Sequence, residues 1–304
     1  MHTETFYSHG KLLLTGEYLV LDGAKALAIP CKFGQTLHAT ATQNLNSSWT
    51  SYDDKNQIWL NLEFKMHEVL SKMNIGKSEP EARLFEILLA IDQLNPEALK
   101  SNFDFETRLE FPKEWGLGSS STLISNLAQW ANVDAYQLLK LTFGGSGYDI
   151  ACAMSASALC FQLVKNKQPK IESASFPDAI KPYTYFVHLG QKQNSRSAII
   201  HYRANPPKDL NAIISKVDQL THQFLQVSSL EEAQYILEQH ENLLSKVLQM
   251  NTIKSSKFSD FDGAIKSLGA WGGDFIMVLS QHNPTSYFEK KGLETILSYQ
   301  QMAL

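Results

Sequence analysis

Apolar and polar residues alternate along DFETRLEF, residues 104–111. Such alternation is typical of a strand with one buried face, because successive side chains of a strand point to opposite sides. The residues expected on the buried face are Phe105, Thr107, Leu109 and Phe111. Two apolar runs, ALCFQLV from residue 158 and YTYFVHL from residue 183, predict two further, buried strands.

Other segments have apolar residues every three or four positions, which is the spacing of one face of a helix. In EARLFEILLAIDQL, residues 81–94, this face contains Leu84, Leu88, Ile91 and either Ile87 or Leu94. Residues 210–227 and 231–250 show the same spacing and predict a packed helical pair. The first of the two stripes contains Leu210, Ile213, Ile214, Val217, Leu220 and Phe224. We interpret these stripes as core, and the mixture of strands and helices predicts an α+β fold.

The polar stretch KNKQPKIESASFPDAIKP, residues 165–182, separates the two apolar runs and predicts a domain junction. We therefore expect an N-terminal domain over residues 1–165 and a C-terminal domain over residues 180–304. A chain of 304 residues with 43% hydrophobic residues is long enough to bury a core in each.

Charge and cysteine content exclude several classes of protein. A net charge of -4 and a pI near 6.1 argue against nucleic acid or an anionic membrane as the partner. The first residues, MHTETFYSHGKLLLTGEYL, place charges around a short apolar run, which predicts neither a secretory signal nor a membrane span, so we expect a cytoplasmic protein. Three cysteines without paired spacing predict buried, reduced thiols and no zinc site: Cys31, Cys152 and Cys160.

The segment FPKEWGLGSSSTLISNLAQWA, residues 111–131, joins the alternating strand to a helix that begins near Ser119. Glycines at 116 and 118 let the backbone approach a ligand, and the helix N-terminus offers N–H groups at the positive end of the helix dipole. Serine hydroxyls add hydrogen-bond donors or oxygen ligands for Mg²⁺. We interpret this loop as a site for nucleotide phosphate; the alternative is an ordinary glycine turn with a serine N-cap. The sequence contains neither a GxxxxGK[ST] nor a GxSxG pattern.

Four segments together resemble the GHMP kinases, a superfamily that includes galactokinase, homoserine kinase, mevalonate kinase and phosphomevalonate kinase. They are HGKLLLTGEYLVLDGAKALAIP at 9–30, PKEWGLGSSS at 112–121, GGSGYDIA at 144–151 and KSLGAWGGDF at 266–275. The resemblance spans Gly10 to Phe275, and the GYDIA motif is most similar to the phosphomevalonate-kinase-like branch. It implies a two-domain fold, with an N-terminal domain like ribosomal protein S5 and a ferredoxin-like C-terminal domain that carries the helical pair.

The resemblance also implies a reaction centre and a nucleotide site. Lys11 and Asp149 correspond to the catalytic residues: the aspartate faces the acceptor group and the lysine neutralises charge. The residues that correspond to the ATP site are Pro112, Gly116, Leu117, Gly118, Ser119, Ser120 and Ser121. Of these, Ser120, or its neighbour Ser119, corresponds to the hydroxyl that assists Mg²⁺, so ATP and Mg²⁺ are the implied cofactors.

Residues on the acceptor side are also implied by the resemblance: Glu17, Tyr18, Ser146, Gly147, Lys192, Ser195, Arg196, Gly269 and Ala270. Lys192 and Arg196 lie in GQKQNSRSA, residues 190–198, where cations suit an anionic acceptor. The expected partners are ATP and this small molecule, and a homodimer is left open.

The chain departs from the family pattern at three places. Ser8 and His9 stand where a Pro-Gly pair often precedes the lysine, and Trp271 interrupts a loop of small residues. Between Val133 and Asp149 the only acid is Asp134, whereas mevalonate kinases supply a glutamate to Mg²⁺ from this region. We therefore expect a kinase acting on phosphomevalonate or mevalonate. The alternatives are a lyase like diphosphomevalonate decarboxylase and a catalytically silent ligand-binding protein of the same fold.

Overall fold

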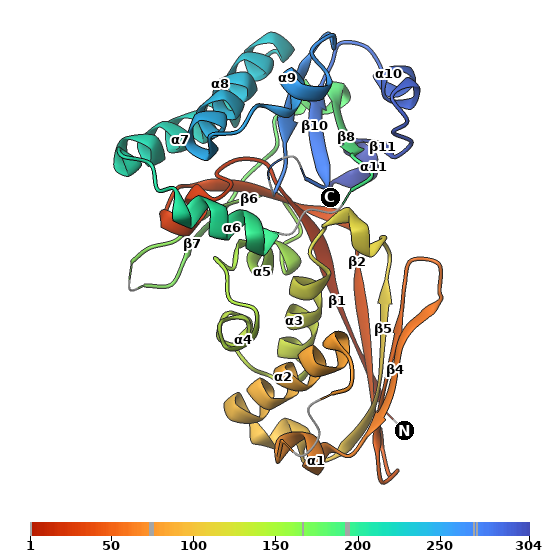
Figure 1. Cartoon of the computed structure of the whole chain (residues 1–304). Helices are drawn as coiled ribbons and strands as arrows, with labels where there is room; N and C mark the ends of the chain where they lie inside the picture. The colour runs from red at the N-terminus through yellow and green to blue at the C-terminus, as the bar shows by residue number, and fades with distance from the viewer. Residues whose placement is uncertain (1, 73–75, 166, 192–194, 270, 272) are drawn as a thin grey trace. The chain divides into compact units, whose positions relative to one another are not determined.

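The computed structural model describes residues 2–72, 76–165, 167–191, 195–269, 271 and 273–304, and Figure 1 gives its helices and strands. The chain forms two compact units. Unit 1 contains Met1–Gly10, Phe33–Lys113 and Leu117–Met154; unit 2 contains Lys11–Lys32, Glu114–Gly116 and Ser155–Leu304. These bounds differ from those of the two expected domains, since residues 11–32 and 114–116 pack with the C-terminal part of the chain.

Unit 1 is built on a mixed sheet, in which some neighbouring strands are parallel and others antiparallel. Its strands are β1 (Thr3–Leu13), β2 (Ala26–Thr42), β3 (Ser47–Tyr52), β4 (Ile58–Phe64) and β5 (Asn102–Leu109). In this unit the order is β4-β3-β5-β2, with β1 paired to β2. Strands β3 and β5 are parallel, whereas β5 is antiparallel to β2 and β3 to β4.

Strand β5 confirms the alternation that the sequence predicted. Phe105, Thr107 and Leu109 are buried, and the residues between them are half-buried. The strand ends at Leu109, and Phe111 is buried just beyond its end, at the start of the glycine–serine loop.

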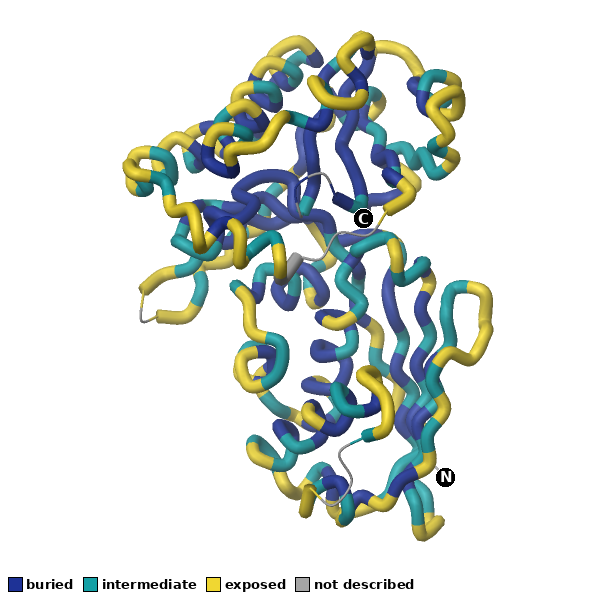
Figure 2. Tube along the Cα trace, viewed as in Figure 1, coloured by how far each residue is buried: buried dark blue, intermediate teal, exposed yellow. Residues whose placement is uncertain are grey.

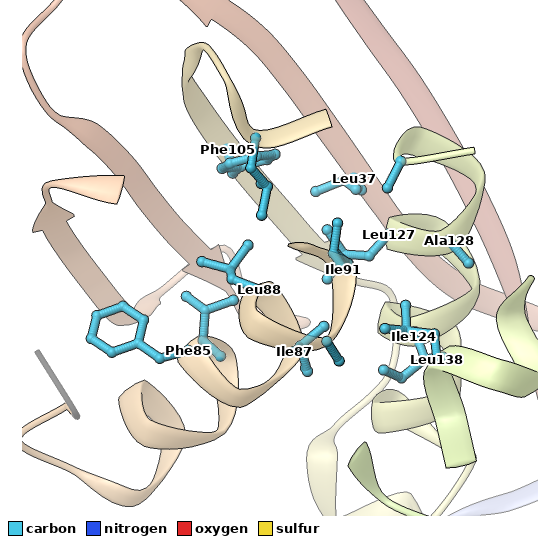
Figure 3. Packing of buried hydrophobic residues seen from close by; sticks show 14 of the residues in the cluster. Leu37, Phe85, Ile87, Leu88, Ile91, Phe105, Ile124, Leu127, Ala128 and Leu138 are labelled. Atoms are coloured by element: carbon cyan, nitrogen blue, oxygen red, sulfur yellow. The ribbon is translucent and has the colours of Figure 1, made fainter. Parts of the chain in front are cut away.

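The helices of unit 1 complete its core. They are α1 (Met66–Leu70), α2 (Glu79–Leu94), α3 (Ser119–Trp130), α4 (Ala135–Thr142) and α5 (Tyr148–Ala153), with a 3-10 turn at Pro96–Leu99. Figure 3 shows Leu88 and Ile91 of α2 and Leu127 of α3 packed near Phe105 and Leu37 of the sheet. The predicted helical face is confirmed: four of its members are buried and Leu94 is partly buried.

Unit 2 contains a second sheet, which is antiparallel throughout. Its order is β11-β8-β10-β9. The strands are β8 (Thr184–His188), β9 (Ala264–Ser267), β10 (Phe275–Leu279) and β11 (Ile296–Ser298). In the same unit, the first residues of β2 pair with β6 (Leu159–Gln162), which pairs with β7 (Lys170–Ser173). The runs at 158 and 183 therefore contain strands, as predicted.

The helices of unit 2 include the predicted pair. They are α6 (Ser195–Ala204), α7 (Leu210–Phe224), α8 (Leu230–Leu248), α9 (Ile253–Lys257), α10 (Thr285–Lys290) and α11 (Tyr299–Met302), with 3-10 turns at Leu19–Asp22 and Asp178–Tyr183. Helix α7 packs on α8, and α8 packs on β9. This arrangement agrees with the ferredoxin-like domain and helical pair expected from the sequence.

Burial follows the amphipathic patterns of the sequence, and Figure 2 shows β9 and β10 buried along their length, whereas β4 and β7 are largely exposed. All three cysteines are buried, as predicted. Burial raises the pKa of the Cys31 thiol to about 12, so this thiol stays protonated at neutral pH. Among the described helices, none is both long and apolar enough to cross a membrane.

Candidate functional site

The glycine–serine loop leads from β5 into α3 through two glycines in the left-handed region. Gly116 has φ +64° and Gly118 has φ +90°, a conformation that other residues rarely adopt. Gly118 is the N-cap of α3, and in the described chain this helix start has no side-chain cap. The alternative of a serine N-cap is therefore wrong. The first N–H groups of α3 are left to an outside acceptor, at the positive end of the helix dipole.

Two charged residues of unit 2 contact Gly116. The Nζ of Lys11 donates a hydrogen bond to the carbonyl oxygen of Gly116 at 3.1 Å. A side-chain carbon placed on Gly116 would lie 1.9 Å from Oδ2 of Asp274, so only glycine fits here. Sequence reasoning missed Asp274, although it is the only acid of the quoted KSLGAWGGDF segment.

The bend before Gly116 is fixed within unit 2 by aromatic packing. The ring of Trp115 lies 5.5 Å from that of Phe275 and 6.4 Å from that of His188, measured between centroids. The Nε2 of His188 lies 3.2 Å from the carbonyl oxygen of Glu114. Residues 114–116 are thus held by β8 and β10, which explains why so short a segment packs with the C-terminal part of the chain.

Asp149 contacts the other end of the loop, within unit 1. The hydroxyl of Ser121 donates a short hydrogen bond to Oδ2 of Asp149. Asp149 lies in the first turn of α5, whose N-cap is Gly147 with φ +86°. A side chain at Gly147 would meet the ring of Tyr136, whose pKa is raised to about 12 by burial and by the charges of Asp134 and Asp149. Ser146, which precedes this glycine, is half-buried.

Helix α3 is held against the sheet of unit 1 by buried polar contacts. The hydroxyl of Ser8 donates to Oδ1 of Asn126 at 2.7 Å. The amide of Asn126 donates to the carbonyl oxygen of Gln35 at 2.8 Å, and the hydroxyl of Thr122 donates to the Gln35 side chain at 2.6 Å. Ser8, one of the departures from the family pattern, is therefore an anchor for the helix that begins at the loop.

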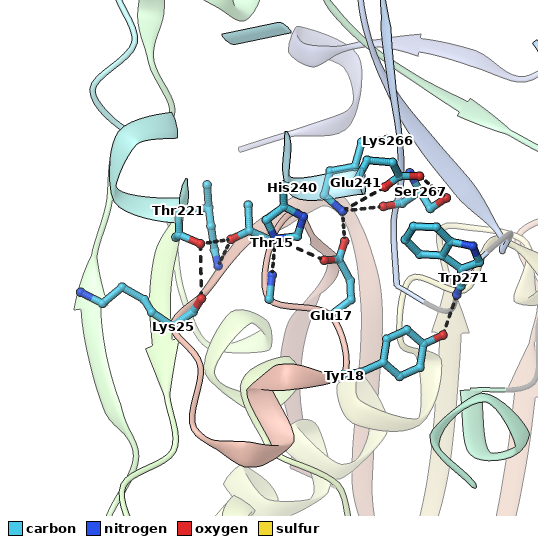
Figure 4. Close-up of polar contacts among 12 residues, drawn as sticks. Thr15, Glu17, Tyr18, Lys25, Thr221, His240, Glu241, Lys266, Ser267 and Trp271 are labelled. Atoms are coloured by element: carbon cyan, nitrogen blue, oxygen red, sulfur yellow. Dashed lines mark hydrogen bonds and ion pairs between the residues drawn. The ribbon is translucent and has the colours of Figure 1, made fainter. Parts of the chain in front are cut away.

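Two of the predicted acceptor contacts are enclosed by unit 2. Glu17 is 2% exposed, and its carboxylate is bound by Lys266 (Figure 4). The hydroxyl of Tyr18, which is also buried, accepts a hydrogen bond from the backbone N–H of Trp271 at 2.7 Å. The carboxylate of Glu17 is thus bound by a buried lysine, and its role at the acceptor stays a prediction.

The remaining acceptor candidates lie around the third glycine segment and helix α6. Gly269 has φ +65° with open space at its Cβ position, and the Trp271 indole is packed in the unit 2 core, where it donates to the carbonyl oxygen of Asn251 at 3.0 Å. Ser195 and Arg196 begin α6. Lys192, Ala270 and the side chains of Ser195 and Arg196 fall outside the described residues.

The described residues include no group of three or more His, Cys, Asp or Glu side chains that could hold a metal ion. Among the described residues, the oxygen donors at the unit 1 end of the loop include the exposed hydroxyl of Ser120 and the carboxylate of Asp149 that Ser121 contacts. Hydroxyl and carboxylate oxygens suit Mg²⁺, which keeps several waters and binds through substrate phosphates together with one or two protein oxygens. The donor set therefore fits a Mg²⁺ ion that arrives with a nucleotide.

Comparison with models of protein families finds no match, and comparison with curated proteins finds none either. Solved structures resemble the chain over nearly its whole length. Mevalonate kinase of Methanococcus jannaschii is 16% identical with a TM-score of 0.72, and the match covers 100% of this chain and 98% of that one.

Two further similar structures are of kinases in complex with other small molecules. The Streptococcus pneumoniae phosphomevalonate kinase, in complex with phosphomevalonate and AMPPNP, is 16% identical with a TM-score of 0.69; 97% of this chain and 99% of that one are covered. The Lactococcus lactis galactokinase, complexed with galactose, is 14% identical with a TM-score of 0.64; the covered shares are 95% and 88%. These likenesses confirm the predicted fold.

Proposed function

We propose that this chain, which has the GHMP kinase fold, is an ATP-dependent kinase that transfers the γ-phosphate of ATP to an anionic small molecule. The observation that carries the proposal is that both predicted catalytic residues bind the glycine–serine loop: Lys11 at Gly116 and Asp149 at Ser121.

The nucleotide is assigned to the loop on physical grounds. Left-handed glycines, an N-cap without a side chain and a helix N-terminus together present backbone N–H groups to an anion. One structure of the same fold contains AMPPNP, an ATP analogue, which supports ATP as the donor. We assign the phosphates to Gly116–Ser121, with Pro112 before the turn.

In the proposed reaction the acceptor hydroxyl attacks the γ-phosphorus. A new P–O bond forms, the bond to the β–γ bridging oxygen breaks, and ADP leaves with the electron pair. Asp149 orients the acceptor hydroxyl and accepts its proton, and Ser121 holds that carboxylate in place. Lys11 places a positive charge at the loop, where it offsets the negative charge of the phosphates.

Mg²⁺, which the Ser120 hydroxyl would hold together with the phosphate oxygens, would supply further neutralisation of charge on the triphosphate. We propose phosphomevalonate or mevalonate as the acceptor, read by Lys192, Ser195 and Arg196. An anionic acceptor is favoured because arginine binds a carboxylate or phosphate through two parallel hydrogen bonds.

A coupled assay of ADP release tests the activity directly. The panel contains ATP and Mg²⁺ with phosphomevalonate, mevalonate, diphosphomevalonate, galactose or homoserine. We expect turnover with phosphomevalonate or mevalonate and little with galactose, which would leave the cations without a partner. Release of CO₂ from diphosphomevalonate would identify a lyase instead, and ADP release with none of the five would contradict the proposal.

Asp149→Asn tests the chemistry, because it keeps the size of the side chain and removes its charge. We expect kcat to fall by roughly 10²–10⁴-fold, the usual contribution of a positioned acid or base, with a smaller change in ATP affinity. Asp134→Asn is the matched control, since asparagine caps a helix as well as aspartate does and Asp134 caps α4. Near-normal turnover of Asp149→Asn would exclude a catalytic role for this residue.

A further inference from the structure

Unit 2 encloses a group of four ionisable side chains, which Figure 4 shows close together. They come from three segments of the chain: Glu17 from the GEYL segment, His240 and Glu241 from α8, and Lys266 from β9. Each is at most 2% exposed. Charged groups are rarely enclosed in this way unless they are paired, because removing a charge from water costs several kcal/mol, roughly, per ion.

Lys266 is the positive centre of this group. Its ammonium binds Oε1 of Glu17, donates to the carbonyl oxygen of Ser267 at 2.9 Å, and lies 3.8 Å from Oε2 of Glu241. The other oxygen of Glu241 accepts from the backbone N–H and the hydroxyl of Ser267, at 3.1 and 2.9 Å. Glu241 is therefore committed to the end of β9, whereas Glu17 depends on Lys266 for its strongest contact.

His240 is the neutral member of the group. Its Nε2 accepts a hydrogen bond from the backbone N–H of Gly16 at 3.1 Å, so this nitrogen carries no proton. Burial, and then the charge of Lys266, hold the pKa of His240 well below its ordinary value. His240 thus fixes the residue before Glu17 without adding a charge.

The turn that follows Glu17 is strained. Tyr18 has φ +62° and ψ -50°, and the N–H of Leu19 donates to the carbonyl oxygen of Glu17 at 2.7 Å, which closes a three-residue γ-turn. A positive φ is unusual for so bulky a residue, and this form of γ-turn is rare and strained. Such backbone persists only where surrounding contacts enforce it.

The contacts that enforce this turn lie on both sides of it. Glu17, the residue before Tyr18, forms an ion pair with Lys266. The Tyr18 hydroxyl accepts a hydrogen bond from the backbone N–H of Trp271. Lys266 and Trp271 belong to one short segment, since β9 ends at Ser267 and leads into the third glycine segment. The GEYL turn and this segment are therefore joined at two points.

We propose that Glu17 and Lys266 are a positioning pair that holds the strained turn at Tyr18 and, through the Tyr18 hydroxyl, sets the position of Trp271. The charge on Glu17 controls the strength of the pair, because a charge-assisted hydrogen bond weakens when the carboxylate is protonated. The ionisable groups that face Glu17 are Lys266, Glu241 and His240.

Burial raises the pKa of Glu17 to about 7, against the opposing effect of Lys266. The carboxylate therefore changes its charge near neutral pH, well above the range of an exposed glutamate. Any effect on catalysis rests on the proposed function, because Gly269 and Ala270 of the same segment are acceptor residues only by the family resemblance. The effect on Trp271 does not depend on it.

The test is ¹⁹F NMR of the full chain labelled with 5-fluorotryptophan, without nucleotide or acceptor. Trp271→Phe identifies the Trp271 resonance among the five tryptophans. In the wild type we expect this resonance to shift with pH, with a midpoint near 7. In Glu17→Gln we expect the transition to be lost and the resonance to stay near its low-pH position. Glu238→Gln, an exposed glutamate on the same helix α8 as Glu241, is the matched control and should titrate like the wild type.

A Trp271 resonance that does not move between pH 5.5 and 8.5, or that titrates unchanged in Glu17→Gln, would overturn the proposal. The wild-type titration requires no variant, so the test stands even where Glu17→Gln does not fold. Because the signal needs no substrate, failure of the kinase assay and failure of this proposal are told apart.

Discussion

Gly118 stands at a position where helices usually have serine, threonine, aspartate or asparagine. A glycine N-cap gives up a side-chain hydrogen bond, yet three serines follow immediately at 119–121. The φ of +90° explains the choice, since a residue with a Cβ atom is strained there. The first N–H groups of α3 thus have no side-chain cap among the described residues, at some cost in helix stability. The proposed phosphate site explains this arrangement, because phosphate oxygens would accept hydrogen bonds from these groups.

Gly118→Ala tests this reason. We expect the dissociation constant for MgATP to rise at least about tenfold, which corresponds to about 1.4 kcal/mol, because the added methyl group strains the turn that aims the N–H groups. Calorimetry on the folded variant measures the change.

Gly292→Ala is the control for strain alone. Gly292 has φ +80° with open space around its Cβ position, so alanine there carries a similar backbone penalty at a turn after α10, outside the glycine–serine loop. The control should bind MgATP like the wild type. Equal MgATP affinities in the wild type, Gly118→Ala and Gly292→Ala would show that the loop does not bind the nucleotide.

At the scale of the element, α3 carries the loop because the helix itself is held by buried polar contacts. Thr122, Ser125 and Asn126 face the sheet, where aliphatic residues would be the ordinary choice. Their partners are Gln35 of β2 and Ser8 of β1. Hydrogen bonds have fixed directions, so they define the position of a helix more narrowly than apolar packing does.

Thr122→Val replaces the hydroxyl by a methyl group of similar size. The Gln35 side-chain oxygen then loses its partner, and we expect the free energy of unfolding to fall by about 1–3 kcal/mol, the cost of an unsatisfied buried polar group. Urea denaturation measures the loss. Thr142→Val, at the half-buried end of α4, removes a hydroxyl that bonds only carbonyl oxygens of its own helix and should cost less. A similar loss in both variants would argue against a special role for Thr122.

The sequence predicted the positions of those helices and strands that have a regular pattern of apolar residues. The alternation of Phe105 and Leu109 placed β5, and the spacing of Leu84 and Leu88 placed α2. The pairing of Ser8 with Asn126 could not be predicted, because a buried polar residue gives no periodic signal and its partner is 118 positions away. Motif resemblance indicated Asp149 and Ser121, but their hydrogen bond emerges only from the fold.

At the scale of the whole molecule, unit 2 is completed by residues from far along the chain. The N–H of Lys25 donates to Asp218 at 2.6 Å, and Thr221 donates to Thr15 at 2.8 Å. Glu17 and Lys266 are 249 positions apart. A boundary predicted from a polar stretch, such as residues 165–182, cannot reveal such pairings. Burial of Glu17 therefore depends on unit 2 being assembled, and its pKa shift becomes a contribution to stability.

The sign of this contribution follows from proton binding. The pKa of Glu17 rises from 4.5 to about 7 on folding, so between these values the folded protein holds a proton that the unfolded chain releases. The contribution of Glu17 to stability is complete below about pH 4.5 and is lost as the pH rises through about 7. His240 acts in the opposite direction: its lowered pKa gives a contribution that is lost as the pH falls below about 6.5.

Comparing the wild type with Glu17→Gln isolates the glutamate, because His240 and Glu241 are present in both proteins. We expect the stability difference, wild type minus variant, to decrease from pH 4.5 to pH 7 by at most about 1.4 kcal/mol per pH unit, the limit for one proton. Urea denaturation at half-unit pH steps measures it, with Glu238→Gln as the exposed control. A difference that is constant over this range would mean that Glu17 titrates alike in the folded and unfolded chain. Its burial beside Lys266 would then have no electrostatic consequence.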